Sequence, residues 1–224
     1  MGLAIDGSVS NFASAATLTV DLTTTNPNDV VVVFAHTDGV STPPTISGTA
    51  PGLSGWTQRA QAAQSNNFLI TEWWAIATQP LTNLPIDVSA VGGVFIATVA
   101  FGVSGANMAA PFDPNPSLPA TAPGAVSVSG VSTIDFNTML IMGIRFANTA
   151  TPTPGAFGAF AATGIADLAN DFTLAQYLVV ATPQTNITAT VGTGSMDTGA
   201  AIVDAIFALP DQPSGTLGLA SAEW

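Results

Sequence analysis

The chain contains no cysteine, which excludes disulfide bonds and thiolate metal sites. Basic residues are almost absent, since Lys and Arg together number 2 against 14 Asp and Glu, giving a formal net charge of -12. A chain with so few cations cannot neutralise nucleic-acid phosphates or bind an anionic membrane surface. The composition therefore predicts neither nucleic acid nor membrane as a partner.

Charged residues of either sign make up only 7% of the chain, whereas soluble domains carry about a quarter. Thr, Ser, Asn, Gln and Ala take their place. This pattern predicts a surface partly covered by neighbouring subunits, with the acidic side chains facing solvent. An acidic soluble protein without such contacts is the alternative.

Long hydrophobic runs are also missing. The apolar segments 30–35 and 94–103 are too short to span a bilayer. Residues 1–6 lack the basic region and the long apolar run of a secretory signal.

The chain does contain a duplicated pattern of strands. Short apolar runs rich in β-branched residues predict buried strands, and the alternation over 17–23 predicts a strand with one buried face. The runs recur at a spacing of roughly a hundred residues, far longer than the repeat of a solenoid or propeller. The corresponding segments are 28–36 with 137–145, 68–78 with 172–182, and 95–103 with 201–209.

These strands predict an all-β fold, a single antiparallel β-sandwich or jelly roll over residues 1–224. Each half holds about five strands and would leave an apolar sheet face uncovered, so we expect one domain with intertwined halves. The proline-rich loop 111–116 is expected to be a stiff bridge between the two sheets. Only 161–170 is compatible with a turn or two of helix. Residues 1–14 and 211–224 are candidate docking arms.

One hairpin can be placed in register from its turn. Segments 56–63 and 68–77 flank a polar turn, and centring that turn between Ser65 and Asn66 sets Arg59 opposite Glu72. We interpret this as a structural cross-strand ion pair. The same register sets Ala63 opposite Phe68 and Thr57 opposite Trp74.

Candidate catalytic groups are sparse. His36 is the single histidine, it aligns with Arg145 in the repeat, and both are expected at the solvent end of a core strand. Glycosidases need two carboxylates at a defined separation, but nothing in the sequence pairs Glu72, Asp87 and Asp204, and Gln176 replaces Glu72 in the other half. No catalytic residue is therefore assigned, and the chain is expected not to be an enzyme.

The sequence evidence for a metal site or a sugar site is equally weak. Two oxygen-rich groups, Asp113 with Asn115 and Asp167 with Asn170 and Asp171, lack the ligand spacing of a calcium loop, so no metal or cofactor is assigned. The adjacent Trp73 and Trp74 must point to opposite faces of a strand, and we interpret the tryptophans as packing residues rather than as a sugar platform.

The order of these features resembles a group of jelly-roll or concanavalin-like β-sandwich proteins of tailed bacteriophages and prophages. The resemblance covers about residues 15–209 and rests on packing and turn patterns. The segments that carry it are 28–35, Gly55-Trp56-Thr57, Glu72-Trp73-Trp74-Ala75, 97–106, Pro111-Phe112-Asp113, the apolar strand of the second half and the final 205–209.

The resemblance implies a virion structural protein without catalytic residues. The expected role is a capsid decoration or cement subunit in the virion, assembled in the host cytoplasm. Its expected partners are further copies of the chain, as a trimer or dimer, and other virion proteins such as the major capsid protein. The alternative is a carbohydrate-binding module of a tail, baseplate or head fibre, with a surface glycan as its ligand.

Overall fold

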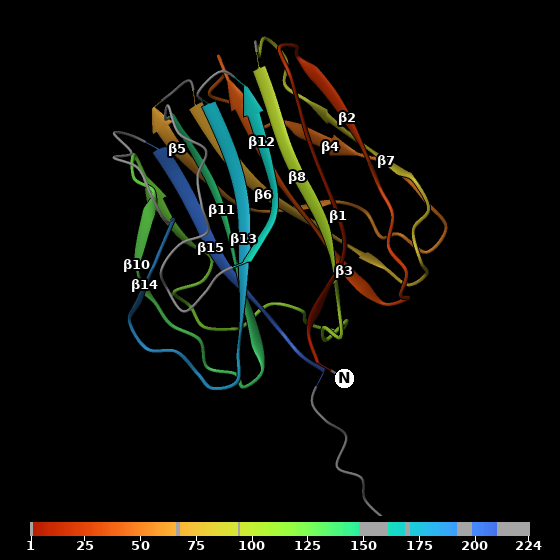
Figure 1. Cartoon of the computed structure of the whole chain (residues 1–224), viewed down its shortest axis with the longest axis vertical. Helices are drawn as coiled ribbons and strands as arrows, with labels where there is room; N and C mark the ends of the chain where they lie inside the picture. The colour runs from red at the N-terminus through yellow and green to blue at the C-terminus, as the bar shows by residue number, and fades with distance from the viewer. Residues whose placement is uncertain are drawn as a thin grey trace, which may run out of the picture.

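The fold is described from a computed structural model, which covers residues 2–65, 68–93, 95–147, 161–168, 171–191 and 199–209. Within these ranges the regular elements are antiparallel strands, and the all-β prediction is confirmed (Figure 1). Residues 161–168, considered above for a helical turn, form a strand instead. The described part of the chain holds no helix of membrane-spanning length and hydropathy.

The first half of the chain builds two sheets. A five-stranded sheet has the order β1-β8-β3-β6-β5, and a three-stranded sheet has the order β2-β7-β4. The long apolar strands β3 and β8 are buried along nearly their whole length because both faces of their sheet are covered. The strands are β1 (Ala4–Ala13), β2 (Thr17–Leu22), β3 (Asp29–Asp38), β4 (Thr45–Ser47), β5 (Thr57–Ser65), β6 (Phe68–Ala77), β7 (Leu84–Ser89) and β8 (Phe95–Ser104).

The second half repeats this plan. Its five-stranded sheet has the order β12-β13-β11-β15-β9, and β10 pairs with β14 in a two-stranded sheet. The central strand β11 pairs with β13 and β15, as β3 pairs with β6 and β8. The strands are β9 (Ala120–Pro123), β10 (Ser127–Val131), β11 (Thr138–Ala147), β12 (Ala161–Leu168), β13 (Asp171–Val180), β14 (Ile187–Thr190) and β15 (Gly199–Phe207).

The two halves exchange no strand between their sheets, so the expectation of intertwined halves is wrong. Each half instead uses its own small sheet to cover one face of its five-stranded sheet, and the other half to cover the second face. Figure 1 shows the resulting layers, with β2, β4 and β7 on one side and β10 and β14 on the other. The apolar face that one half leaves open is therefore buried by its duplicate.

Three apolar cores separate the four layers. The central core lies between the two five-stranded sheets and takes residues from both halves, including Phe34, Phe101 and Ile141. The two outer cores lie between each five-stranded sheet and its small sheet. In β2 the alternating burial of Leu18, Val20 and Leu22 is as predicted, since one face of this strand packs on the outer core.

The turns before the two central strands are also duplicated. Thr24 exchanges two hydrogen bonds with Leu81 through its amide and hydroxyl, at 2.9 and 3.1 Å. Thr133 makes the same pair with Gln184, at 3.0 and 2.9 Å. Asn residues with positive φ, at positions 28 and 137, immediately precede β3 and β11. Asn tolerates this conformation better than most residues.

The hairpin of β5 and β6 has the predicted register only at the end away from its turn. Thr57 pairs with Trp74 as expected, but Glu72 pairs with Ala60 and Phe68 pairs with Ser65. Bulges between 58 and 60 and between 63 and 65 add one residue each to β5, namely Arg59 and Gln64. The predicted pairing of Arg59 with Glu72 and of Ala63 with Phe68 is therefore wrong.

The proline-rich connection packs between the two halves, and most of the N-terminal candidate arm is part of a sheet. Phe112 forms an isolated bridge with Ile206 of β15, and its ring lies edge-on to Trp74 of β6, so this loop contacts both five-stranded sheets. Most of the candidate arm 1–14 is β1, which pairs with β8 at the edge of its sheet. Residues 211–224 lie outside the described residues.

Candidate functional site

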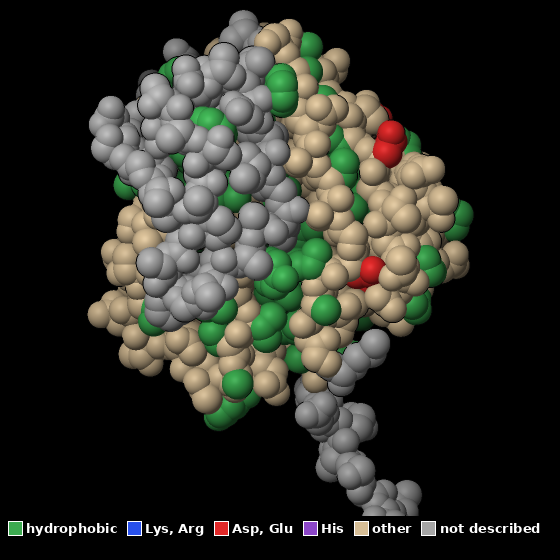
Figure 2. All heavy atoms as spheres, in the orientation of Figure 1, with side chains coloured by type: hydrophobic (Ala, Val, Ile, Leu, Met, Phe, Trp, Pro, Cys, Tyr) green, Lys and Arg blue, Asp and Glu red, His purple; other side chains and the backbone are tan. Residues whose placement is uncertain are grey.

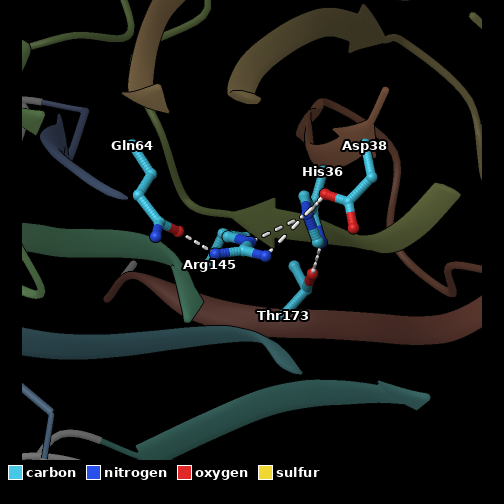
Figure 3. A network of polar contacts seen from close by, with 5 residues as sticks. All are labelled: His36, Asp38, Gln64, Arg145 and Thr173. Carbon is cyan, nitrogen blue, oxygen red and sulfur yellow. Dashed lines mark hydrogen bonds and ion pairs between the residues drawn. The ribbon is translucent and has the colours of Figure 1, made fainter. Parts of the chain in front are cut away.

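Two clusters of polar side chains lie inside the central core, where the two halves meet. The first is built around His36 of β3 and Arg145 of β11 (Figure 3). These residues occupy equivalent positions in the duplicated strands, as the sequence alignment predicted. His36 is fully buried and Arg145 nearly so, which corrects their expected place at the solvent end of a strand.

Both ring nitrogens of His36 have partners. Nε2 lies 2.5 Å from Oδ1 of Asp38 and 3.1 Å from Nε of Arg145, and Nδ1 lies 3.1 Å from Oγ1 of Thr173. Because Nε2 cannot both donate to Asp38 and accept from Arg145, we assign its proton to the shorter contact with Asp38. Nδ1 then accepts the hydroxyl proton of Thr173, which comes from β13 of the other half.

Arg145 connects this cluster to the edge of the sandwich. Its Nη1 donates to Oε1 of Gln64, and its Nη2 lies 3.9 Å from Asp38 Oδ1. Its guanidinium also lies over the ring of Phe68, 4.4 Å from the centroid. Gln64 is the extra residue of the second bulge in β5, so that bulge supplies an interior hydrogen-bond acceptor.

The second cluster contains Arg59, Glu72 and Asp204. Arg59, the extra residue of the first bulge in β5, donates from Nε to Oδ2 of Asp204 on β15 at 2.7 Å. Asp204 also accepts the amide of Ala205 at 2.8 Å. Glu72 of β6 is fully buried, and neither of its carboxyl oxygens has a hydrogen-bond partner.

Aromatic rings cover this second cluster. The guanidinium carbon of Arg59 lies 4.4 Å from the centroid of Phe112, whose ring stands edge-on to Trp74. Burial raises the pKa of Glu72 well above its usual range, and the neighbouring Asp204 carboxyl adds to the effect. Burial also raises the pKa of Asp204 to about 6, although the hydrogen bond from Arg59 opposes the shift.

A further buried acid pair lies where β3 begins. Asp6 accepts the amides of Thr25 and Asn26 at 2.9 and 2.6 Å. Burial opposes ionisation there, but these hydrogen bonds and that from the Thr25 hydroxyl bring the pKa of Asp6 down to about 2. Asp29 is fully buried beside it, and burial together with the Asp6 carboxylate raises the pKa of Asp29 to about 7.

Of the three carboxylates considered for a glycosidase pair, two lie close together in the core and one lies on the surface. Glu72 and Asp204 come together from different halves, whereas Asp87 is exposed on β7 and accepts the hydroxyl of Thr19 at 2.6 Å. The pairing was missed because no sequence signal connects one residue of β6 with another on β15. Glu72 and His36 both have 0% exposed area, so a substrate could not contact either side chain in the folded protein.

The oxygen-rich groups considered in the sequence have the following surroundings where their side chains are described. Asp113 uses its carboxylate to accept the amides of Asn115, Ile134 and Asp135, at 2.9, 3.0 and 3.2 Å. No group of three or more His, Asp or Glu side chains that could hold an ion occurs in the described part of the chain. The side chains of Asp167, Asn170 and Asp171 lie outside it.

The described tryptophans are packing residues. Trp73 and Trp74 point to opposite faces of β6, as predicted, and pack against the outer and the central core respectively. Trp56 is half-buried and donates from Nε1 to the Gly48 carbonyl at 3.1 Å. Trp224 lies outside the described residues.

No protein-family model matches the chain, and neither a curated protein nor a solved structure is significantly similar to it. The site must therefore be interpreted from its own geometry. Both polar clusters join strands of one half to strands of the other, which makes them clamps across the central core.

Proposed function

We propose that the chain is a structural protein of a tailed-phage virion, a capsid decoration or cement subunit, and that each half is a jelly roll. The strand pairing of the first half supports the fold assignment. β1 pairs with β8, β2 with β7 and β3 with β6, which is the nesting of a long antiparallel hairpin rolled into two sheets.

The chemistry of the surface is the observation that carries the functional proposal. Among the described acidic side chains only Asp21 and Asp87 are exposed. The expectation that the acids face solvent is thus wrong for this part of the chain, because Asp6, Asp29, Glu72, Asp113 and Asp204 are buried. Both basic residues also point into the central core.

The surface formed by the described residues consequently carries few charges and is rich in Thr, Ser, Asn, Gln and Ala. On the described part of the face in Figure 2, acidic side chains are sparse and no basic one is visible. Contacts made by such a surface depend on packed area and neutral hydrogen bonds rather than on ion pairs. A subunit that its neighbours hold permanently on a particle needs contacts of this kind, made by packed area and neutral hydrogen bonds.

An apolar rim at one end of the second half is the proposed contact with the particle. Ile134, Phe136, Val179 and Leu209 are exposed large hydrophobic residues at the adjoining ends of β11, β13 and β15. The corresponding turn of the first half carries Thr25 and Pro27 where the second carries Ile134 and Phe136. Since the same turn forms with either set, the fold does not require the apolar pair.

The test uses purified particles from a host that carries the gene. Quantitative mass spectrometry should find the chain at a fixed copy number relative to the major capsid protein. Purified chain added to particles that lack it should rebind, and the double variant I134T/F136S should bind at least about tenfold more weakly, the loss expected when about 1.4 kcal/mol of contact is removed.

The matched control is Val91→Ser, which removes an apolar side chain that is 95% exposed in the first half. It should rebind like the wild type. Absence of the chain from particles would contradict the virion proposal, and normal rebinding of I134T/F136S would contradict the role of the rim. Self-association lost in that double variant would instead assign the rim to contacts between copies.

The glycan-binding alternative has less support from the site. Its ligand would need an exposed aromatic platform, and the described tryptophans are half-buried against the cores. Saturable binding on a glycan array, lost on replacing one aromatic residue, would favour that alternative.

A further inference from the structure

Two carboxyl groups from different halves are buried together with a single cation. Glu72 comes from β6 of the first half and Asp204 from β15 of the second, and neither has exposed side-chain area. They are close enough for the charge of Asp204 to act on Glu72. Arg59 is the cation that faces them, and its side chain keeps 26% of its area exposed.

The single guanidinium cannot neutralise both acids. Arg59 already donates to both oxygens of Asp204, at 2.7 and 3.5 Å. Among the described residues a further charged group, Asp113 on the loop along β15, acts on Asp204, and it is also acidic. The full ionisation of the cluster would therefore leave an excess buried negative charge, which is strongly unfavourable.

Glu72 has the environment of a protonated acid. Its two oxygens are buried and have no hydrogen-bond partner among the described residues. Such a state is far less unfavourable for a neutral carboxyl than for a carboxylate. The direction of its pKa agrees, because burial and the Asp204 charge both raise it.

We propose that Glu72 and Asp204 form a proton-binding site between the two halves, in which the bound proton holds the halves together and its loss loosens their contact. The ion pair of Arg59 with Asp204 then closes the clamp from the edge of the sandwich. The aromatic rings of Phe112 and Trp74 keep water from the cluster. This proposal is independent of the virion proposal.

The direction of the pH effect follows from proton binding. A carboxyl whose pKa is raised on folding keeps its proton where the unfolded chain has lost it, so the folded state loses stability as pH rises. For Glu72 this loss begins near its ordinary value of 4.5 and continues to its raised pKa. The clamp is closed in mild acid and weakened in alkali.

Infrared spectroscopy of the full chain tests the proton directly. All measurements are made in an Asp29→Asn background, because the pKa of Asp29 is raised to about 7 and its carboxyl would add a second protonated band and a second pH dependence. At pH 7 this folded reference protein should show the carbonyl band of a protonated carboxylic acid, and adding Glu72→Gln should remove most of it. The added substitution keeps the shape of the neutral acid. With it, the melting temperature should vary less with pH than that of the reference protein, which should fall by several degrees between pH 5 and pH 9.

Hydrogen exchange tests the coupling to the contact between halves. After correction for intrinsic rates, amides of β6 and β15 should exchange faster at pH 9 than at pH 6 in the reference protein and equally fast when Glu72→Gln is added. The matched control is addition of Asp21→Asn, at an exposed acid on β2, which should leave the behaviour of the reference protein unchanged in every measurement.

Three results would overturn the proposal. They are the absence of the protonated band in the Asp29→Asn protein at pH 7, its undiminished persistence when Glu72→Gln is added, and equal pH dependence of melting with and without Glu72→Gln. If the protein with Glu72→Gln does not fold, the pH titration of the band in the Asp29→Asn protein, together with its hydrogen exchange, still decides the matter. A band that disappears with pH and leaves exchange at β6 and β15 unchanged would refute the coupling.

Discussion

Phe34 and Gly143 occupy equivalent positions in the two halves, and the ring of Phe34 lies in the space that a side chain at Gly143 would fill. A Cβ at position 143 would overlap three atoms of that ring. Equivalent central strands therefore meet face to face, with a large residue on one and none on the other. Two residues further along, the equivalent pair His36 and Arg145 is also in contact.

Replacing Gly143 with Ala should destabilise the protein. The added methyl group would displace Phe34 within a closely packed core, and overpacking of this kind costs about 1–3 kcal/mol. Urea unfolding measures the change. Gly55→Ala is the control, because a Cβ there meets nothing within 4 Å, and it should change the free energy of unfolding by less than about 0.5 kcal/mol.

Reducing the size of residue 34 should rescue part of that loss. The double variant F34L/G143A should be less destabilised than the sum of its single changes, because the leucine leaves room for the methyl group. Strict additivity would show that the two positions do not compete for the same space.

Replacing Arg145 with Ala should be more damaging than any single surface change. It would leave the partly buried Asp38 and the side chain of Gln64 without their shared cation, and breaking a buried ion pair costs about 3–5 kcal/mol. Chemical denaturation gives the value. A loss below about 1 kcal/mol, the usual worth of a surface ion pair, would show that this cluster is not a clamp.

Replacing Asp29 with Asn should remove a pH-dependent loss of stability. The pKa of Asp29 rises from its ordinary 3.8 to about 7, so between these values the unfolded chain releases a proton that the folded chain retains. Stability then falls as pH rises through this window and is insensitive to this group above it. Asp29→Asn should be more stable than the wild type at pH 8 and similar at pH 4.

Unfolding free energies at pH 4, 6 and 8 check this, with Asp21→Asn as the exposed control. If Asp29→Asn loses as much stability between pH 4 and pH 8 as the wild type does, the carboxyl of Asp29 is not the group responsible.

Replacing Asp113 with Ala should destabilise the turn before β11. Its carboxylate accepts three backbone amides in that region, and a hydrogen bond to a charged group contributes about 1.5–3 kcal/mol. We expect a loss of at least about 2 kcal/mol in urea unfolding. Asp6→Ala should have a comparable effect, since Asp6 holds the duplicate turn before β3.

Asp87→Ala is the comparison for both changes, because this exposed acid accepts a single side-chain hydrogen bond. A loss for Asp113→Ala no larger than for Asp87→Ala would mean that the turn does not depend on the carboxylate.

The sequence predicted the strand duplication well and two of its three alignments poorly. The match of 95–103 with 201–209 is shifted by three residues, because Val103 corresponds to Ile206 in the pairing with the central strands. The match of 28–36 with 137–145 is correct, because His36 and Arg145 are equivalent in the pairing of their strands. The gapless match of β6 on β13 is off by one residue, since Glu72 faces the central core and Gln176 an outer one. Both faces of these strands are apolar, so hydropathy could not reveal the slip.

The polar clusters were beyond sequence reasoning for a related reason. Arg59 and Gln64 reach the interior through bulges, which no residue pattern in β5 announces. Their partners, Asp204 and Arg145, belong to the other half of the chain. Only the stacking of one sheet on the other brings these side chains together.

The inward placement of most described acids and of both arginines changes how the folded molecule meets an electric field or a salt gradient. Because the pKa values of Glu72 and Asp29 are raised, these acids are wholly or partly neutral near pH 7, and the electrophoretic mobility should be slightly below that expected for the formal charge of -12. Ionic screening acts mainly on charges in water. Contacts made by the described surface should therefore change little between seawater and dilute buffer.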